Sequence, residues 1–192
     1  VPLRKSLKAI AEGDFLDSNT PGFPFVALIV SGGHTSLFYV NDFDKIEILG
    51  ETHDDACGEA FDKVAKILGL GYPGGPLIER LAKSGNPKMQ FSCSNTKQLL
   101  DFSFSGIKTA VLYLVNGKRL TVNEKSDIAA SFQEAVIDTL IKKSLLACRL
   151  KKTNLLVIGG GVAANNRLRE RFYSEAGERD LNIYFPHPKL CM

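Results

Sequence analysis

The sequence predicts an α/β protein, and three features of the chain indicate this class. Short apolar segments at residues 26–30 and 155–158 each run into glycines or a glycine-containing turn, as buried strands do before a turn. Between them, residues 126–151 carry an apolar side chain at every fourth position, which is typical of one face of a helix. These side chains are Ile128, Phe132, Val136 and Leu140. Strands that alternate with helices in this way form a sheet covered by helices.

A β-hairpin is expected to open the sheet. Residues 26–30 and 36–40 have the composition of strands, and the sequence Ser-Gly-Gly-His-Thr joins them. Because glycine adopts positive φ without strain, the two adjacent glycines favour a tight turn there. A third, shorter strand is expected at residues 46–49.

Two helices are expected after the hairpin. Residues 55–69 carry a stripe of apolar side chains at helical spacing, and Gly69 or Gly71 is placed to end that helix. A rigid Tyr-Pro-Gly-Gly-Pro turn follows. Its last residue, Pro76, suits the start of a second helix at residues 77–85.

The rest of the chain completes the α/β pattern. Residues 86–104 look irregular, and residues 105–117 are a moderate helix candidate. After the second glycine-flanked strand, three successive glycines lead into a helix at residues 165–175 and a strand at residues 182–185. The chain contains neither an internal repeat nor a low-complexity segment.

The composition is that of an ordinary soluble globular protein. Of the 192 residues, 44% are hydrophobic and 23% are charged, and the net charge is only +3. This net charge is too small to make the whole surface positive. A bound RNA would therefore need a local basic patch, or basic surface supplied by a partner. The apolar runs are far too short to span a membrane, and the N-terminus lacks the apolar core of a signal peptide.

Four cysteines are scattered along the chain without a CxxC pair. They are Cys57, Cys93, Cys148 and Cys191. This spacing favours reduced thiols over a disulfide framework or a zinc site, and Cys57 has no obvious base beside it to make it a nucleophile. Reduced thiols and the lack of an export signal together predict a cytoplasmic protein with no membrane association.

The turn at residues 31–35 has two interpretations. Successive backbone N–H groups in a glycine turn form a concavity for anions, and the missing Cβ atoms let a phosphate approach closely. Ser31 and Thr35 add hydroxyl groups, and His34 adds an imidazole near the rim. A tight turn with a capping serine explains the same residues, and spacing alone favours that simpler interpretation.

The second glycine turn, residues 159–161, joins a strand to a helix and so offers free N–H groups and a helix dipole to an anion. Gly159, Gly161 and Ala164 match a loose dinucleotide-binding pattern. That pattern also needs an acidic residue at the end of the next strand, and Tyr-Phe-Pro-His-Pro-Lys-Leu provides none. A nicotinamide cofactor is therefore disfavoured, and the absence of a GxxxxGK[ST] motif argues against a P-loop ATPase.

Charged residues line the polar side of the helix at residues 55–69. They are Glu59, Asp62, Lys63 and Lys66, which form two i,i+4 pairs of favourable order. Taken alone, they are best interpreted as a solvent-exposed face. The preceding run His53-Asp54-Asp55 is interpreted as helix-capping, because three consecutive residues rarely converge on one metal ion.

The order of five motifs carries a resemblance that no single motif does. They are FPFVALIVSGGHTSL, DDACGEAFDKVAKILGLGYPGGPLIERLA, DFSFSGIKTAVL, DIAASFQEAVIDTL and GGGVAANNRLR, between residues 23 and 169. In this order they resemble the TsaD family of tRNA N6-adenosine threonylcarbamoyltransferases, of bacterial or organellar type. The combination of SGGHT, GEAFDK, YPGGP and FSFSGIKT is highly specific.

The resemblance implies a partial actin-like ATPase fold of the sugar-kinase and heat-shock-protein superfamily (ASKHA). Residues 23–192 would form a lobe of that fold with a helical insertion around residues 72–150, and residues 1–22 an atypical or disordered remnant. The family's substrate is threonylcarbamoyl-AMP, an ATP-type ligand. Its threonylcarbamoyl group passes to N6 of adenosine 37 in tRNAs that read ANN codons, an acyl transfer with AMP as the leaving group.

Substrate contacts of the family carry over to matching positions of this chain. These are Ile29, Val30, Ser31, Gly32, Gly33, Asp62, Gly75, Glu79 and Asn165, with Glu79 standing where many relatives have Asp. The hairpin would hold the phosphate side, and Asp62 and Glu79 would bind sugar hydroxyls. Gly75 would permit close approach of the nucleoside, and Asn165 would cap the glycine turn against the ligand. His34 is a catalytic candidate, with a histidine bonded to its own loop as an equal alternative.

The resemblance also implies a metal, Fe²⁺ or Zn²⁺, held by an upstream HxxxH pair and by an Asp in a downstream Cys-Thr-Asp-Asn segment. The sequence departs from the family here. No histidine precedes Phe23, and the chain stops at Cys191-Met192. We therefore expect none of the family's metal ligands in this chain, and expect the 192-residue chain to be inactive by itself.

The implied partners are tRNA, a dimerising non-catalytic paralogue (TsaB-like), a P-loop ATPase (TsaE-like) and the enzyme that makes threonylcarbamoyl-AMP (TsaC-type). Two rival interpretations share the fold, an ATP-binding kinase or ATPase and the scaffold paralogue itself. FSFSGIKT favours the transferase over the first, and the full set of nucleotide-binding motifs favours it over the second. A protease, the family's older label, would need a zinc site or an activated nucleophile, and neither is visible.

Overall fold

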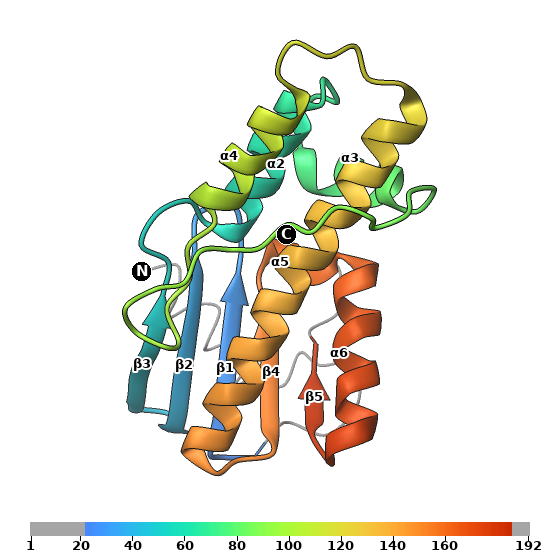
Figure 1. Ribbon diagram of the computed structural model, residues 1–192. Coiled ribbons are helices and arrows are strands. Elements are labelled where there is room, and N and C mark those ends of the chain that lie inside the picture. The colour runs from blue at the N-terminus through green and yellow to red at the C-terminus, as the bar shows by residue number, and fades with distance from the viewer. Residues whose placement is uncertain (1–21, 186–192) are drawn as a thin grey trace.

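A five-stranded sheet forms the centre of the protein, with helices over one face and beyond one end of it (Figure 1). The computed structural model describes residues 22–185. The strands are β1 (Phe25–Val30), β2 (Thr35–Asp42), β3 (Lys45–Glu51), β4 (Leu155–Gly159) and β5 (Asn182–Tyr184). The helices are α2 (Cys57–Ile67), α3 (Gly74–Ala82), α4 (Ser105–Val115), α5 (Val122–Lys151) and α6 (Asn166–Arg179), with a 3-10 turn, η1 (Gly161–Ala164). The predicted α/β class is confirmed.

The strand order is β3-β2-β1-β4-β5. β1 pairs antiparallel with β2 and β2 with β3, which confirms the predicted hairpin and third strand. β4 lies parallel to β1, and β5 lies parallel to β4. The carboxyl ends of β1 and β4 therefore meet at one edge of the sheet, the edge beyond which α2 and α3 gather (Figure 1). In open α/β sheets this is the edge at which ligands bind.

β1 is the central strand, and all of its residues are buried. Leu28 and Val30 belong to the main core between the sheet and the helices. Ala27 and Ile29 point the other way, into a smaller apolar cluster on the opposite face. Because both faces of this strand are covered, its sequence is continuously apolar rather than alternating.

Helix α5 is longer than its apolar period predicts, because it begins at Val122 and not at residue 126. Its start is a capping box. The Thr121 hydroxyl oxygen accepts from the Glu124 N–H at 3.3 Å, and the Glu124 carboxylate accepts from the Thr121 N–H at 2.8 Å. The helix then crosses the sheet and packs against β1, β2 and β4 (Figure 1).

Helix α3 also begins earlier than predicted, at Gly74 with Pro73 as its N-cap. Pro76 therefore lies within the first turn of the helix instead of opening it. A proline is tolerated there because the N–H groups of the first turn have no partner within the helix.

The acidic residues before α2 do not cap that helix as predicted. The N-cap of α2 is Ala56, which has no side-chain cap. Asp54 instead caps α4 across the fold, and its carboxylate accepts from the N–H groups of Phe104 at 2.8 Å and Ser105 at 3.2 Å. It also accepts from the hydroxyls of Ser103 at 2.6 Å and Ser105 at 2.7 Å. The predicted helix cap was therefore assigned to the wrong helix.

Asp55 ties the same two helices together with charge. Its carboxylate pairs with Lys63 of α2 at 2.5 Å and with Lys108 of α4 at 3.1 Å. Of the two i,i+4 pairs expected on α2, Glu59 with Lys63 is present at 2.9 Å. This side of α2 is thus partly a helix–helix contact and not only a solvated face.

Within residues 22–185, no helix is both long and apolar enough to cross a membrane. The expectation of an N-terminal remnant at residues 1–22 falls outside the described residues except for Gly22. Cys191 also lies outside them, and the three described cysteines are free thiols.

The cap formed by Asp54 gives a stability prediction. Burial raises the pKa of Asp54, but hydrogen bonds from Ser103, Ser105 and the backbone outweigh it and hold the pKa below the ordinary 3.8. A carboxyl whose pKa is lowered by folding stabilises the protein above its unfolded-state pKa, and that stability is lost as pH falls through the folded-state value. We expect Asp54→Ala to lower the free energy of unfolding by about 1 kcal/mol at pH 7, and by less at acid pH.

Urea unfolding of the two proteins at pH 7 and at acid pH checks this. Glu178→Ala, which removes an exposed carboxylate from α6, is the matched control and should change stability little. If Asp54→Ala lowers the free energy of unfolding by the same amount at acid pH as at pH 7, the assignment of Asp54 as a charged cap is contradicted.

Candidate nucleotide site

A cavity of about 330 Å³ opens at the carboxyl ends of β1 and β4. Four segments that are distant in sequence line it. They contribute Gly32 from the hairpin turn; Gly58, Phe61 and Asp62 from α2; Pro73, Gly75, Pro76 and Glu79 from the start of α3; and Gly161, Val162, Ala164 and Asn165 from the second glycine turn. The predicted glycine bends therefore face one shared cavity.

The hairpin turn and the start of α2 touch through their backbones. The Gly58 N–H donates to the Ser31 carbonyl at 3.0 Å, and the Cys57 N–H donates to the buried Thr35 hydroxyl oxygen at 2.8 Å. A Cβ on Gly58 would lie 2.8 Å from the Gly32 Cα, closer than side-chain atoms approach backbone. Glycine at position 58 is thus required by packing.

The second glycine turn is fixed against β1 in the same way. Gly160 has φ +95°, which strains any residue with a Cβ. A Cβ there would also lie 2.3 Å from the Val30 carbonyl oxygen. This turn consequently lies directly beside the end of the hairpin's first strand.

The glycines that line the cavity differ from these packed ones. A Cβ on Gly32 or Gly75 would meet no atom within 4 Å. Gly32, Gly33 and Gly75 all lack positive φ. The expectation that the two hairpin glycines supply positive φ to the turn is therefore wrong. Neither packing nor backbone conformation requires glycine at positions 32 and 75, and each leaves bare main chain exposed to the cavity.

Two carboxylates stand at the cavity wall, each held by one oxygen. Asp62 Oδ1 accepts from the Gly74 N–H at 2.7 Å, so the carboxylate lies at the N-terminus of α3, where the helix dipole favours it. Glu79 Oε1 accepts from the Asn166 N–H at 3.1 Å and from its side-chain amide at 2.7 Å. Among residues 22–185 the second oxygen of each carboxylate has no hydrogen-bond partner.

Asn165 joins the glycine turn to the helices beside it. Its side-chain oxygen accepts from the Leu168 N–H at 2.9 Å and caps α6. Its amide group donates to Gln133 Oε1 of α5 at 2.9 Å, and both residues are buried. Sequence reasoning missed Gln133, which stands beside Glu134 in a helix of mixed polar and apolar residues and so carries no local signal of burial.

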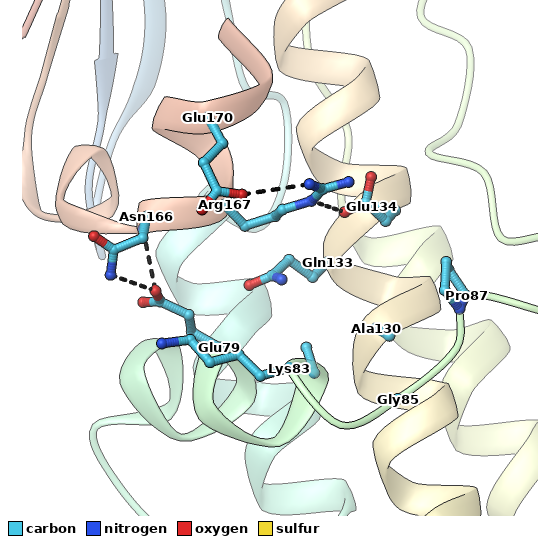
Figure 2. A pocket seen from close by; sticks show the side chains of 11 residues that line it. Glu79, Lys83, Gly85, Pro87, Ala130, Gln133, Glu134, Asn166, Arg167 and Glu170 are labelled. Atoms are coloured by element: carbon cyan, nitrogen blue, oxygen red, sulfur yellow. Dashed lines mark hydrogen bonds and ion pairs between the residues drawn. The ribbon is translucent and has the colours of Figure 1, made fainter. Parts of the chain in front are cut away.

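A second cavity of about 620 Å³ adjoins the first and shares Glu79 with it. It lies between α3, α5 and α6, and Figure 2 shows Glu79 bonded to Asn166 on one side of it. On the other side, Arg167 pairs with Glu134 at 2.6 Å and with Glu170 at 3.4 Å. No sequence pattern indicates this cavity, because its walls come from three helices that are far apart in the chain.

The remaining predicted contacts lie around the cavity rather than on its lining. Ile29 and Val30 are buried strand residues. The Ser31 hydroxyl oxygen accepts from the N–H groups of His34 at 3.0 Å and Gly33 at 3.4 Å, as a capping serine does. His34 itself is exposed at the tip of the turn. Its role as a catalytic residue stays a prediction.

The described residues do not fit a metal ion. Between residues 22 and 185, no three His, Cys, Asp or Glu side chains lie close enough to share one. Burial raises the pKa of the Cys57 thiol far above its ordinary value, and it raises the pKa of Cys93 to about 11. Both thiols are therefore protonated at neutral pH, and neither is a nucleophile.

Comparison with solved structures identifies the fold. The chain is similar to full-length HypF in its phosphate- and nucleotide-bound form, with a TM-score of 0.68 at 12% identity. The match covers 92% of this chain and 32% of that one. At this identity the likeness shows the fold alone, which is the predicted actin-like ATPase type, present in part.

The family follows from sequence. The TsaD family model, tRNA N6-adenosine threonylcarbamoyltransferase, matches residues 5–192, and the chain belongs to this family. It is 49% identical over 173 residues to the enzyme of that name from Clostridium kluyveri, and 50% identical over 183 residues to the one from Dictyoglomus turgidum. These matches cover 88% and 93% of this chain, but 51% and 54% of the relatives. The chain thus spans about half the length of the curated relatives it matches. The names of these relatives favour neither an ATP-binding kinase or ATPase nor the scaffold paralogue.

The bare surface at Gly75 gives a prediction for ligand binding. A methyl group there meets no protein atom but would occupy the cavity, so Gly75→Ala should weaken AMP binding at least about tenfold. Its stability should stay the same or rise by up to about 1 kcal/mol, the usual gain of Ala over Gly in a helix.

Calorimetric titration with AMP and thermal unfolding measure the two effects. Gly177→Ala in α6 is the matched control, because its Cβ also meets open space but lies away from the cavity lining. Equal AMP affinity in both variants would show that no ligand reaches Gly75.

Proposed function

We propose that the protein transfers the threonylcarbamoyl group from threonylcarbamoyl-AMP to N6 of adenosine 37 in tRNAs that read ANN codons. One observation carries the proposal. The hairpin turn, the start of α3 and the second glycine turn converge on one cavity, and two half-engaged carboxylates flank it. Family membership supplies the class of substrate.

The cavity has a group for each part of an adenylate. The phosphate would lie against the bare main chain at Gly32, beside the first turn of α2, where the helix dipole favours an anion. The ribose hydroxyls would donate to the second oxygens of Asp62 and Glu79. Both carboxylates are held in place by backbone N–H groups before the ligand arrives, so little side-chain freedom is lost on binding.

The reaction is then an acyl transfer. The N6 amine of adenosine attacks the carbamoyl carbon, the new C–N bond forms, and the bond from that carbon to the phosphate oxygen breaks. AMP leaves with the electron pair of the broken bond, and the amine loses one proton. Charge builds on the carbonyl oxygen and on the phosphate, where main-chain N–H groups stabilise it. His34, exposed at the tip of the hairpin, is the candidate to receive the proton.

Three further expectations belong to the proposal. The protein would use Fe²⁺ or Zn²⁺, it would act with the scaffold paralogue, the P-loop ATPase and the threonylcarbamoyl-AMP synthase, and it would work in the cytoplasm. No step above depends on the metal, because the described residues offer no site for it.

Asp62 provides the test of the proposed activity. Asp62→Asn keeps an oxygen to accept from the Gly74 N–H but loses the negative charge, so folding should be kept and ribose binding weakened. We expect threonylcarbamoyladenosine formation to fall at least about tenfold, a cost typical of losing one charged hydrogen bond to substrate.

The assay combines the full-length parent of this chain with tRNA, threonylcarbamoyl-AMP and the partner proteins, and quantifies the modified nucleoside by mass spectrometry. Asp44→Asn, in the β2–β3 turn at the far end of the strands, is the control and should keep full activity. Wild-type protein that forms no threonylcarbamoyladenosine under these conditions would contradict the proposed function.

A further inference from the structure

Four basic side chains gather at the end of the helical layer that lies furthest from the sheet. α2 and α4 run side by side away from the sheet, and the loop between α4 and α5 lies beyond them (Figure 1). The four residues are Lys66 in the last turn of α2, Lys118 and Arg119 in the α4–α5 loop, and Lys125 near the start of α5. We call them the distal basic surface.

Two interactions show that these residues share one surface. Lys125 Nζ donates to the Leu68 carbonyl at 2.8 Å, which joins the start of α5 to the end of α2. Hydrogen bonds from Thr121 lower the pKa of Glu124, and the positive charge of Lys118 adds to this effect, so Lys118 lies close to the same turn of α5. The cations therefore come together although three separate segments supply them.

The fold leaves most of this positive charge without a counter-charge. Lys66, Lys118 and Arg119 are exposed, and within residues 22–185 none of their side chains has a hydrogen-bond or ion-pair partner. The Glu124 carboxylate is already engaged, because it accepts from the N–H and the hydroxyl of Thr121, each at 2.8 Å. The net charge of the whole chain is only +3, so three unpaired cations at one end are a local concentration of charge.

Helix dipoles account for only part of this arrangement. Lys66 lies in the last turn of α2, where a cation is favourable. Lys118 and Arg119 lie in the loop after α4, and neither side chain bonds a helix carbonyl in the described part of the chain as Lys125 does. Stabilisation of the helices therefore does not explain these two residues.

We propose that the distal basic surface binds the phosphate backbone of the anticodon stem of the tRNA. The inference rests on the proposed function, which supplies RNA as the substrate. Unpaired lysine and arginine side chains bind phosphates regardless of base sequence and fix the orientation of the nucleic acid. A protein of small net charge needs such a local patch to bind RNA.

The position of the surface suits a contact that orients the RNA and does not take part in the reaction. α2 starts on the hairpin turn, and from Gly58 to Leu68 it extends about 15 Å. Along α5, Thr121 stands about 18 Å from Gln133, which bonds Asn165 of the adenylate cavity. A base at this surface is too far away to react at the cavity. The backbone of the anticodon stem, however, lies within such a distance of nucleotide 37.

The test is RNA binding by the full-length parent of this chain, measured separately from AMP binding. Fluorescence anisotropy of a labelled anticodon stem-loop RNA gives the affinity at several salt concentrations, and calorimetry gives the affinity for AMP. Lys118→Ala combined with Arg119→Ala should weaken RNA binding at least about tenfold. The slope of log affinity against log salt should fall by roughly 1.5, as expected for two lost phosphate contacts. Lys118→Arg combined with Arg119→Lys keeps both charges and should bind RNA as wild type does.

Lys142→Ala combined with Arg149→Ala is the matched control. It removes two exposed cations, also without side-chain partners among residues 22–185, from the C-terminal half of α5, which lies at the amino end of β4. This variant should keep its RNA affinity, and every variant should bind AMP as wild type does.

Wild-type RNA affinity after loss of Lys118 and Arg119 would overturn the proposal. Equal losses in the two double alanine variants would also overturn it, because they would show a general effect of net charge. Unchanged RNA affinity with weaker binding of a proposed partner protein would assign the surface to that protein instead. RNA binding that depends on Lys118 and Arg119, in a protein that forms no threonylcarbamoyladenosine, would support the RNA surface and contradict the proposed function.

Discussion

Backbone-to-backbone contact at two glycines is the constraint on which the rest of the site depends. Gly58 lets the first turn of α2 rest on the hairpin at Ser31 and Gly32, and Gly160 lets the second glycine turn rest on the end of β1. A single methyl group at either position would collide with main-chain atoms that have no room to move. Because three segments meet without intervening side chains, the space beside them is left to a ligand.

Polar side chains then hold the surrounding helices in register with this contact. Asp62 fixes the start of α3, Glu79 fixes the start of α6, and Gln133 connects α5 to Asn165. Each bond spans elements that are separate in the chain, and each involves a residue at or beside the cavity. Positioning the helices and presenting oxygens to a ligand are therefore tasks of the same residues, so a substitution at Asp62 or Glu79 affects architecture as well as binding.

Local patterns in the sequence predicted most of the elements but not how they are connected. The hairpin, α2 and the glycine turn before α6 follow from apolar spacing and glycines. The start of α5 is also encoded locally, by Thr121 and Glu124, but the apolar residues at every fourth position suggested a later start at residue 126. Asp54 as a cap of α4 could not be predicted, because the bond joins residues 50 positions apart. The convergence of the glycine bends was inferred from the family, since spacing alone equally allows a simple turn.

Amide hydrogen exchange with and without AMP tests most directly whether these bends form one adenylate site. Binding should slow exchange together in the hairpin turn at residues 31–34, the start of α3 at residues 74–75 and the second glycine turn at residues 159–165. The β2–β3 turn, at the opposite end of the strands, should exchange at the same rate in both states. Slower exchange in only one of the three segments, or in none of them at saturating AMP, would contradict a shared site.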